Sequence, residues 1–128
     1  MVIIDDSIIR GTSSASIIHT LREAGAHKIY MIVTYPPVRF PCYAGIDFPS
    51  MEELLANQKF LNEGQKIGLN KKISKLIGAD KVFYNDTKNL AKAIGIAEEE
   101  LCFTCSTGNY SSLGITPKFR TREEVKGE

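Results

Sequence analysis

The chain opens on a short apolar run that ends in two adjacent carboxylates and leads into a loop of small hydroxylated residues. Residues 2–4 form the apolar run, Asp5 and Asp6 form the pair, and residues 7–14 form the loop. A continuous apolar run is typical of a parallel strand that is buried on both faces. Because open α/β sheets bind ligands beyond the carboxyl ends of their strands, we expect the two carboxylates at a ligand-binding edge.

The loop itself favours a phosphate. Gly11, Thr12, Ser13 and Ser14 can present backbone N–H groups and hydroxyls at the start of the helix that follows. The positive end of a helix stabilises an anion by roughly 0.3–1 kcal/mol when the site is exposed. Arg10 adds the only full positive charge of the loop. The loop therefore predicts a phosphate-binding site.

The carboxylates need a different partner, because they would repel a phosphate that touched them. A sugar diol donates hydrogen bonds to carboxylate oxygens, and a hard cation such as Mg²⁺ is coordinated by them. A phosphorylated ribose accompanied by Mg²⁺ satisfies the loop and the carboxylates together. A second interpretation stays open: a strand, an Asp-Asp turn and a Ser/Thr helix cap, as in many α/β domains.

Residues 2–14 resemble the phosphoribosyl-pyrophosphate (PRPP) motif of type I phosphoribosyltransferases, and most closely that of the amidophosphoribosyltransferases, the glutamine PRPP amidotransferases. The block Asp-Asp-Ser-Ile-Ile-Arg-Gly-Thr at 5–12 carries the likeness, and the blocks at 21–26, 36–47 and 102–110 continue it in order. The resemblance covers about residues 1–110. Ser13 stands where a second Thr is common, and Ala44 stands where an aromatic or other residue is usual.

The resemblance implies an α/β fold: part of a type I phosphoribosyltransferase-like, Rossmann-like domain, with a mostly parallel sheet flanked by helices. We expect this partial domain over residues 1–114 and a loose polar tail over 115–128. Family members are glycosyltransferases of purine biosynthesis, which convert glutamine and PRPP into 5-phosphoribosylamine. The ligands implied are PRPP, ribose 5-phosphate or a purine nucleotide.

The resemblance also implies a role for each residue of the motif. Asp5 and Asp6 would bind the ribose hydroxyls and help to hold Mg²⁺. The 5′-phosphate loop would consist of Ser7, Arg10, Gly11, Thr12, Ser13 and Ser14. The implied cofactor is therefore Mg²⁺, arriving with PRPP.

Two parts of a complete family member have no counterpart in this sequence: the glutaminase domain and the first half of the transferase domain. We therefore expect no activity from this chain alone, and assign no catalytic residue. Because an apolar strand edge without a neighbour invites pairing, we expect a homo-oligomer or assembly with a separately encoded N-terminal part. The alternatives are a regulatory module that binds PRPP or nucleotides without turnover, and a truncated product without a role.

The three cysteines resemble part of a cluster site. Cys102 and Cys105 have the C-x-x-C spacing that lets two thiolates share one metal, and Cys42 lies sixty residues upstream of Cys102. By resemblance, the three match three of the four ligands of the [4Fe–4S] cluster found in some family members. With one ligand missing, our working expectation is no metal. Zinc with a borrowed ligand, a 102–105 disulfide and three reduced thiols stay open.

Charge and hydropathy exclude several classes of partner. The chain has 16 basic and 15 acidic residues, a net charge of +1, so neither nucleic acid nor an anionic membrane is implied. No apolar run approaches the roughly eighteen residues of a membrane span, and no signal peptide precedes the motif, so a cytoplasmic location is expected. His19 and His27 lie far from any acid–base group in the sequence and are expected at the surface.

Periodicity and turn residues predict the remaining elements. We expect helices at 14–24 with Ile17, Ile18 and Leu21 inward, at 50–61 with a Ser50–Glu53 capping box, at 71–77, and at 87–94 capped by Asp86. Strands are expected at 28–34, at 82–84 and, as a short final strand, at 101–104. Residues 35–49, rich in proline and aromatic residues, are expected to form an ordered, packed loop.

Overall fold

The structure, a computed structural model, describes residues 1–45, 50–57 and 66–117. Its centre is a parallel sheet of three strands: β1 (Val2–Asp5), β2 (Tyr30–Val33) and β3 (Lys81–Tyr84), in the order β1-β2-β3. Helices alternate with the strands along the chain, so the expected α/β class with a parallel sheet is confirmed. Strand β1 lies at one edge of the sheet and pairs with β2 alone.

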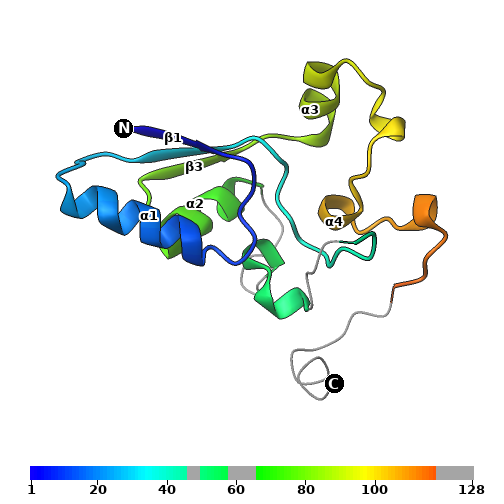
Figure 1. Cartoon of the computed structure of the whole chain (residues 1–128), viewed down its shortest axis with the longest axis horizontal. Helices are drawn as coiled ribbons and strands as arrows, with labels where there is room; N and C mark the ends of the chain where they lie inside the picture. The colour runs from blue at the N-terminus through cyan, green and yellow to red at the C-terminus, as the bar shows by residue number, and fades with distance from the viewer. Residues whose placement is uncertain (46–49, 58–65, 118–128) are drawn as a thin grey trace.

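Two twelve-residue helices, α1 (Thr12–Glu23) and α2 (Lys66–Ile77), cover one face of the sheet (Figure 1). Their buried residues join the inward-facing strand residues in one core, which includes Ile18, Met31, Val33, Ile73, Ile77 and Val82. The prediction that Ile17 points inward is wrong, because its side chain is 46% exposed. The buried stripe of α1 runs through Ser14 and Ile18 instead, which are four residues apart.

The opposite face of the sheet has no helix over it in the described part of the chain (Figure 1). Side chains alternate between faces along a strand, so Val2 and Ile4 share this uncovered face. The side chains on it are exposed: Val2 57%, Ile4 69%, Ile32 40% and Phe83 48%. Ile4, Ile32 and Phe83 are register partners across the three strands and form one apolar row. The expectation that β1 is buried on both faces is therefore wrong for this chain.

Residues 35–45, which follow β2, form neither helix nor strand, yet they pack closely, as expected. Val38 is buried, and the backbone N–H groups of Arg39 and Phe40 donate to the Cys105 carbonyl at 2.8 and 2.9 Å. That carbonyl belongs to α4 (Thr104–Thr107), a short helix. The predicted strand at 101–104 is wrong because residues 101–103 have no strand partner and the helix begins at Thr104. Positions 46–49 lie outside the described residues.

The predicted helix at 50–61 is wrong over its described part. Two 3-10 turns, Met51–Glu53 and Leu55–Asn57, take its place, separated by Leu54 in an extended conformation. The Ser50 hydroxyl donates to the Glu53 carboxylate at 3.5 Å and caps no backbone N–H, so the capping box does not start a longer helix. Leu54 and Leu55 are buried, and the rest of the predicted helix lies outside the described residues.

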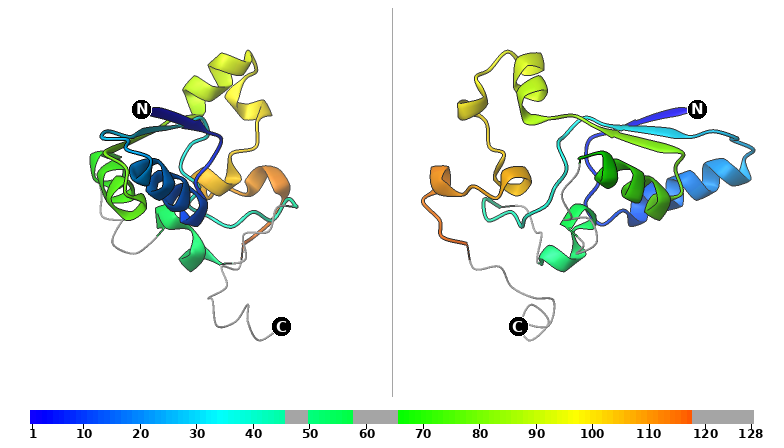
Figure 2. Two further views of the ribbon diagram at one scale, coloured as in Figure 1. Left: turned by 60° about the vertical axis from the view of Figure 1, so that its left-hand side comes forward. Right: turned by 180° about the vertical axis from the view of Figure 1, so that it is seen from behind.

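In the second half of the described chain, the helix ends and caps agree closely with those predicted from local sequence patterns. Helix α2 begins five residues earlier than expected and ends, as predicted, before Gly78. The Asp86 side chain accepts from the Asn89 N–H and caps α3 (Thr87–Ile94), which ends at Gly95. Helix α3 lies beyond the carboxyl end of β3, away from α1 and α2 (Figure 2). The 3-10 turns at Glu98–Glu100 and Ser111–Leu113 follow.

No element is seen at 115–117, and the rest of the expected tail lies outside the described residues. None of the helices in the described ranges has the length and apolar character that a bilayer span requires.

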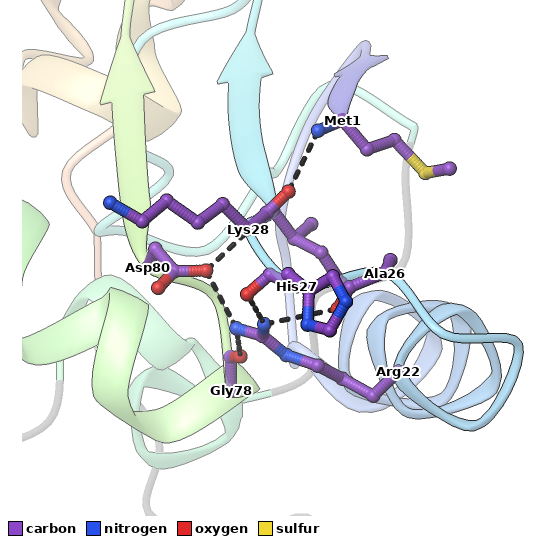
Figure 3. Close-up of polar contacts among 8 residues, drawn as sticks. Met1, Arg22, Ala26, His27, Lys28, Gly78 and Asp80 are labelled. Atoms are coloured by element: carbon purple, nitrogen blue, oxygen red, sulfur yellow. Dashed lines mark hydrogen bonds and ion pairs between the residues drawn. The ribbon is translucent and has the colours of Figure 1, made fainter.

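A network around Arg22 closes the amino end of the sheet (Figure 3). The Arg22 guanidinium donates to the carbonyls of Ala26, His27 and Gly78 at 3.3, 2.6 and 3.3 Å. It also pairs with the Asp80 carboxylate at 2.6 Å. One side chain in the last turn of α1 thereby joins the turn before β2 to the turn before β3.

Candidate functional site

A cavity of about 300 Å³ opens at the carboxyl end of β1. Its lining contains all eight residues that the sequence assigned to the sugar and phosphate: Asp5, Asp6, Ser7, Arg10, Gly11, Thr12, Ser13 and Ser14. Ile9 completes the lining. The structure therefore brings the candidate residues together around one space, at the edge of a parallel sheet where ligands bind in open α/β folds.

Helix α1 begins in this cavity with free backbone donors. Its N-cap is Gly11, and no side chain caps it, so the Ser/Thr cap of the second sequence interpretation is not formed. The first helical hydrogen bond runs from the Ala15 N–H to the Gly11 carbonyl at 2.9 Å. The N–H groups of Thr12, Ser13 and Ser14 consequently have no helical acceptor. Three uncapped donors at a helix N-terminus suit the oxygens of a phosphate.

The backbone conformation and the packing at position 11 require glycine. Its φ of +79° lies in the left-handed region, and a Cβ at this position would lie 2.7 Å from Leu55 Cδ2. A second contact fixes the loop, because the Leu55 N–H donates to the Ile9 carbonyl at 2.8 Å. Ile8, next to Ile9, is buried in the core. These contacts therefore hold the loop in this conformation without a ligand.

The two carboxylates are held by their backbone and keep accepting capacity. The carbonyls of Asp5 and Asp6 accept from the N–H groups of Thr34 and Tyr35, both at 3.0 Å. Asp5 Oδ1 accepts from the Asp6 N–H, and Asp6 Oδ1 accepts from the Ser7 hydroxyl. Neither Oδ2 atom receives a hydrogen bond from the described residues. Each carboxylate can thus accept a sugar hydroxyl or bind a cation through its second oxygen.

Arg10 has a partner that the sequence analysis missed. Its guanidinium lies 3.5 Å from the Glu53 carboxylate, and its side chain is 45% exposed. Forty-three positions separate the two residues, and Glu53 was assigned to a helix cap, so no local signal indicated the pair. A phosphate in the cavity would compete with Glu53 for Arg10.

The described residues contain no ready-made metal centre. No group of three or more His, Cys, Asp or Glu side chains lies close enough to bind a metal ion within these ranges. Mg²⁺ commonly uses one or two carboxylates and completes its coordination with water and phosphate oxygens. Asp5 and Asp6 fit that requirement, whereas a structural metal site would need more protein ligands.

The three cysteines are free thiols, and two of them, Cys102 and Cys105, contact Tyr35. The Tyr35 hydroxyl donates to the Cys102 carbonyl at 3.2 Å and lies 3.5 Å from Cys105 Sγ. Burial raises the pKa of the Cys105 thiol, and the nearby thiols of Cys42 and Cys102 raise it further. A hydrogen bond with Thr104 lowers the pKa of Cys102, which is exposed. As arranged here, the thiols do not form a metal-binding group, so we derive no chemistry from a cluster.

Both histidines lie away from the cavity, as expected. His19 is exposed on α1 and lies 3.5 Å from the Glu23 carboxylate, one helical turn further on. His27 is exposed after the helix end.

The chain is similar to several known proteins. The chain is 43% identical over 110 residues to an amidophosphoribosyltransferase of Pyrococcus horikoshii, covering 86% of this chain and 22% of that protein. It is 38% identical over 123 residues to that of Methanocaldococcus jannaschii, covering 96% and 24%. The chain thus spans about a fifth to a quarter of the length of these relatives. No family model matches the chain.

A solved structure shows the same arrangement of elements. The glutamine PRPP amidotransferase of B. subtilis, complexed with ADP and GMP, matches with a TM-score of 0.70 and 36% identity. The match covers 85% of this chain and 23% of that one. The expected likeness to a type I phosphoribosyltransferase fold is thereby confirmed. Over the region that they share, the chain is a homologue of the amidophosphoribosyltransferases of purine biosynthesis.

Proposed function

We propose that the cavity at the end of β1 binds a ribose 5-phosphate group, as the PRPP-binding part of an amidophosphoribosyltransferase. The observation that carries the proposal is the uncapped start of α1, where the N–H groups of Thr12, Ser13 and Ser14 face a cavity lined by two carboxylates. The 5′-phosphate accepts from these donors and from the Thr12 hydroxyl, and the Ser7 hydroxyl turns from Asp6 to donate to it. Arg10 leaves Glu53 to pair with it.

Asp5 and Asp6 bind the ribose end of the ligand. Their Oδ2 atoms accept hydrogen bonds from the ribose hydroxyls and help to hold Mg²⁺ when pyrophosphate oxygens complete its coordination. A purine nucleoside monophosphate competes for the same loop, because it carries the same ribose 5-phosphate. The complex of the B. subtilis relative with ADP and GMP supports this. The three cysteines supply at most three of the four ligands that a [4Fe–4S] cluster needs, and the proposal does not use them.

We propose that a further polypeptide segment, from a second copy or from the remainder of a transferase, covers the apolar row Ile4, Ile32 and Phe83 and pairs with the edge of β1. Parallel sheets are stable when both faces are covered, and an unpaired edge strand favours pairing. The small share of the relatives that the chain matches supports the same proposal.

The binding proposal is tested by calorimetric titration of ribose 5-phosphate, with and without Mg²⁺, at millimolar concentrations. Thr12→Val, which removes a hydroxyl from the cavity, should weaken binding about threefold to tenfold, as loss of a hydrogen bond to a charged group does. The control is Thr20→Val, on the same helix, whose hydroxyl donates to the Ser16 carbonyl away from the cavity. No binding to the unmodified chain, or equal losses in both variants, would contradict the proposal.

The partner proposal is tested by light scattering over a range of concentrations. Ile4→Lys should reduce self-association, or association with an added N-terminal transferase fragment, because it places a charge on the open face. Ile17→Lys is the matched control, since Ile17 is a similarly exposed isoleucine on α1, which covers the other face. A monomer that binds no such fragment at high concentration would refute the proposal.

A further inference from the structure

A second cavity, of about 380 Å³, opens at the carboxyl ends of β2 and β3. Residues after β2, the middle of α2, the start of α3 and the end of α4 surround it. It shares no lining residue with the cavity at the phosphate loop. The second cavity is therefore a separate space at the same edge of the sheet.

The hydroxyl of Tyr84, from β3, is buried and has no hydrogen-bond partner among the described residues. Ser106, from α4, also lines the cavity, and its side chain interacts with Tyr35 and Cys105. Burial raises the pKa of Tyr84, so its phenol stays protonated and can donate a hydrogen bond. Buried polar atoms without a partner are rare because they lose hydration without compensation. An acceptor atom in the cavity would satisfy the Tyr84 hydroxyl.

Arg39 brings a positive charge to the same cavity. Of the three arginines in the described ranges, Arg10 pairs with Glu53 and Arg22 pairs with Asp80. Arg39 is half-buried and forms no ion pair within those ranges. A guanidinium and a phenol donor in one cavity are a combination that recognises carboxylate or phosphate oxygens.

The remaining lining residues indicate what the rest of the ligand should be like. Pro36, Pro37 and Leu69 give the cavity an apolar side. Asp86 lies at the cavity too, but both of its carboxylate oxygens accept hydrogen bonds from Asn89, so its charge is engaged by its own helix. The cavity thus combines an anion-binding side with an apolar side.

We propose that this second cavity binds a small organic anion, a phosphate or carboxylate joined to an apolar group. Arg39 supplies the charge, and the hydroxyl of Tyr84 supplies a hydrogen bond. The proposal does not depend on ribose phosphate binding at α1, because the two cavities have no residue in common.

The test uses the whole chain, labelled with ¹⁵N, titrated with phenyl phosphate, benzoate or inorganic phosphate. We expect phenyl phosphate or benzoate to shift the amide signals of residues 85–87 and 106–107, with saturation. The aromatic anion should bind more tightly than inorganic phosphate, which cannot use the apolar wall. Whichever aromatic anion binds more tightly identifies the head group.

Variants separate the two cavities. Tyr84→Phe removes only the hydroxyl, and Arg39→Gln removes the charge; each should weaken binding at the second cavity about tenfold, as loss of a hydrogen bond to a charged group does. Tyr30→Phe, in β2, is the matched control for Tyr84→Phe, and Lys75→Gln, at an exposed cation on α2 outside both cavities, is the control for Arg39→Gln. Both controls should leave the shifts at 85–87 unchanged.

Two results would overturn the inference: no saturable shift at the second cavity with any aromatic anion, or shifts that both Tyr84→Phe and Arg39→Gln leave unchanged. If Arg39→Gln does not fold, Tyr84→Phe decides alone, because it keeps the shape of the side chain. Binding at 85–87 without binding at 11–14 would support this inference and contradict only the proposed function.

Discussion

The two ends of the parallel sheet use their polar groups in opposite ways. At the amino end, Arg22 donates to three carbonyls and pairs with Asp80, and Asp80 in turn accepts from the Ile29 N–H at 2.8 Å. At the carboxyl end, the first N–H groups of α1 and one oxygen each of Asp5 and Asp6 have no partner in the described chain. The first end holds the fold together, and the second is available to a ligand.

The direction of the elements explains this difference. In a parallel sheet with following helices, every helix starts near the carboxyl edge, so its free N–H groups gather there. Helices end near the amino edge, where free carbonyls favour a cation, and Arg22 is the basic residue in the last turn of α1. Changes at the amino end should therefore affect stability, whereas changes at the carboxyl end should affect binding.

The largest effect is expected at Gly11, where one substitution should affect both stability and ligand binding. Gly11→Ala forces a side chain into a left-handed conformation and into Leu55, so we expect a loss of about 2–4 kcal/mol in unfolding free energy from strain and overpacking. Ribose 5-phosphate binding should be lost as well, because the start of α1 moves. Urea unfolding and titration measure both. Gly25→Ala, with an open position and a similar φ of +93°, separates the backbone strain from the packing term.

The next effect concerns the amino end alone. Arg22→Met keeps the length of the side chain but removes its bonds to three carbonyls, and we expect a loss of about 1–2 kcal/mol in unfolding free energy, because the site is one-third exposed. Ligand affinity should not change. Lys75→Met, an exposed cation in the last turn of α2, is the control and should have little effect. A large change in affinity with Arg22→Met would refute the separation of the two ends.

The converse test is at the carboxyl end. Asp6→Asn should weaken Mg²⁺-dependent PRPP binding about tenfold, equivalent to about 1.4 kcal/mol, because an amide cannot replace a carboxylate on Mg²⁺. Stability should stay within about 0.5 kcal/mol, as for an exposed substitution. The control is Glu23→Gln, an exposed carboxylate at the far end of α1. Equal affinities for Asp6→Asn and the unmodified chain would remove Asp6 from the site.

The smallest effect is a pH dependence at the amino end. Hydrogen bonding from the Ile29 N–H, and then from Arg22, lowers the pKa of Asp80 below its ordinary value of 3.8. The charged carboxylate therefore stabilises the fold fully above this value, and its contribution is lost as pH falls through the lower folded-state pKa. The difference in unfolding free energy between the unmodified chain and Asp80→Asn should shrink as pH falls below 3.8. A constant difference would show that the ionised form contributes nothing.

Sequence alone predicted those elements whose signals are local. The Asp86 cap, the helix ends at Gly78 and Gly95 and the strand at 82–84 depend on residues a few positions apart, and all four are confirmed. The candidate phosphate loop could also be predicted from the sequence, because a strand, a carboxylate pair and a glycine-containing turn follow each other directly. The structure places these residues around one cavity.

The features that were missed depend on distant residues. The 3-10 turns at 51–57 replace a helix although the Ser50–Glu53 spacing suits a capping box, since Ser50 bonds to the Glu53 side chain. The Arg10–Glu53 and Arg22–Asp80 pairs join residues 43 and 58 positions apart. Likewise, an apolar run predicts burial on both faces of β1 but does not show which polypeptide covers the second face. Tertiary contacts decide these points, and one sequence carries no direct record of them.

The central claim is that a ribose phosphate binds where β1 leads into α1. A crystal structure of the chain soaked with ribose 5-phosphate and Mg²⁺ tests it most directly. The account predicts the phosphate within hydrogen-bonding distance of the Thr12, Ser13 and Ser14 N–H groups, with the ribose hydroxyls at Asp5 and Asp6. A sugar phosphate bound elsewhere, with this cavity empty, would contradict it.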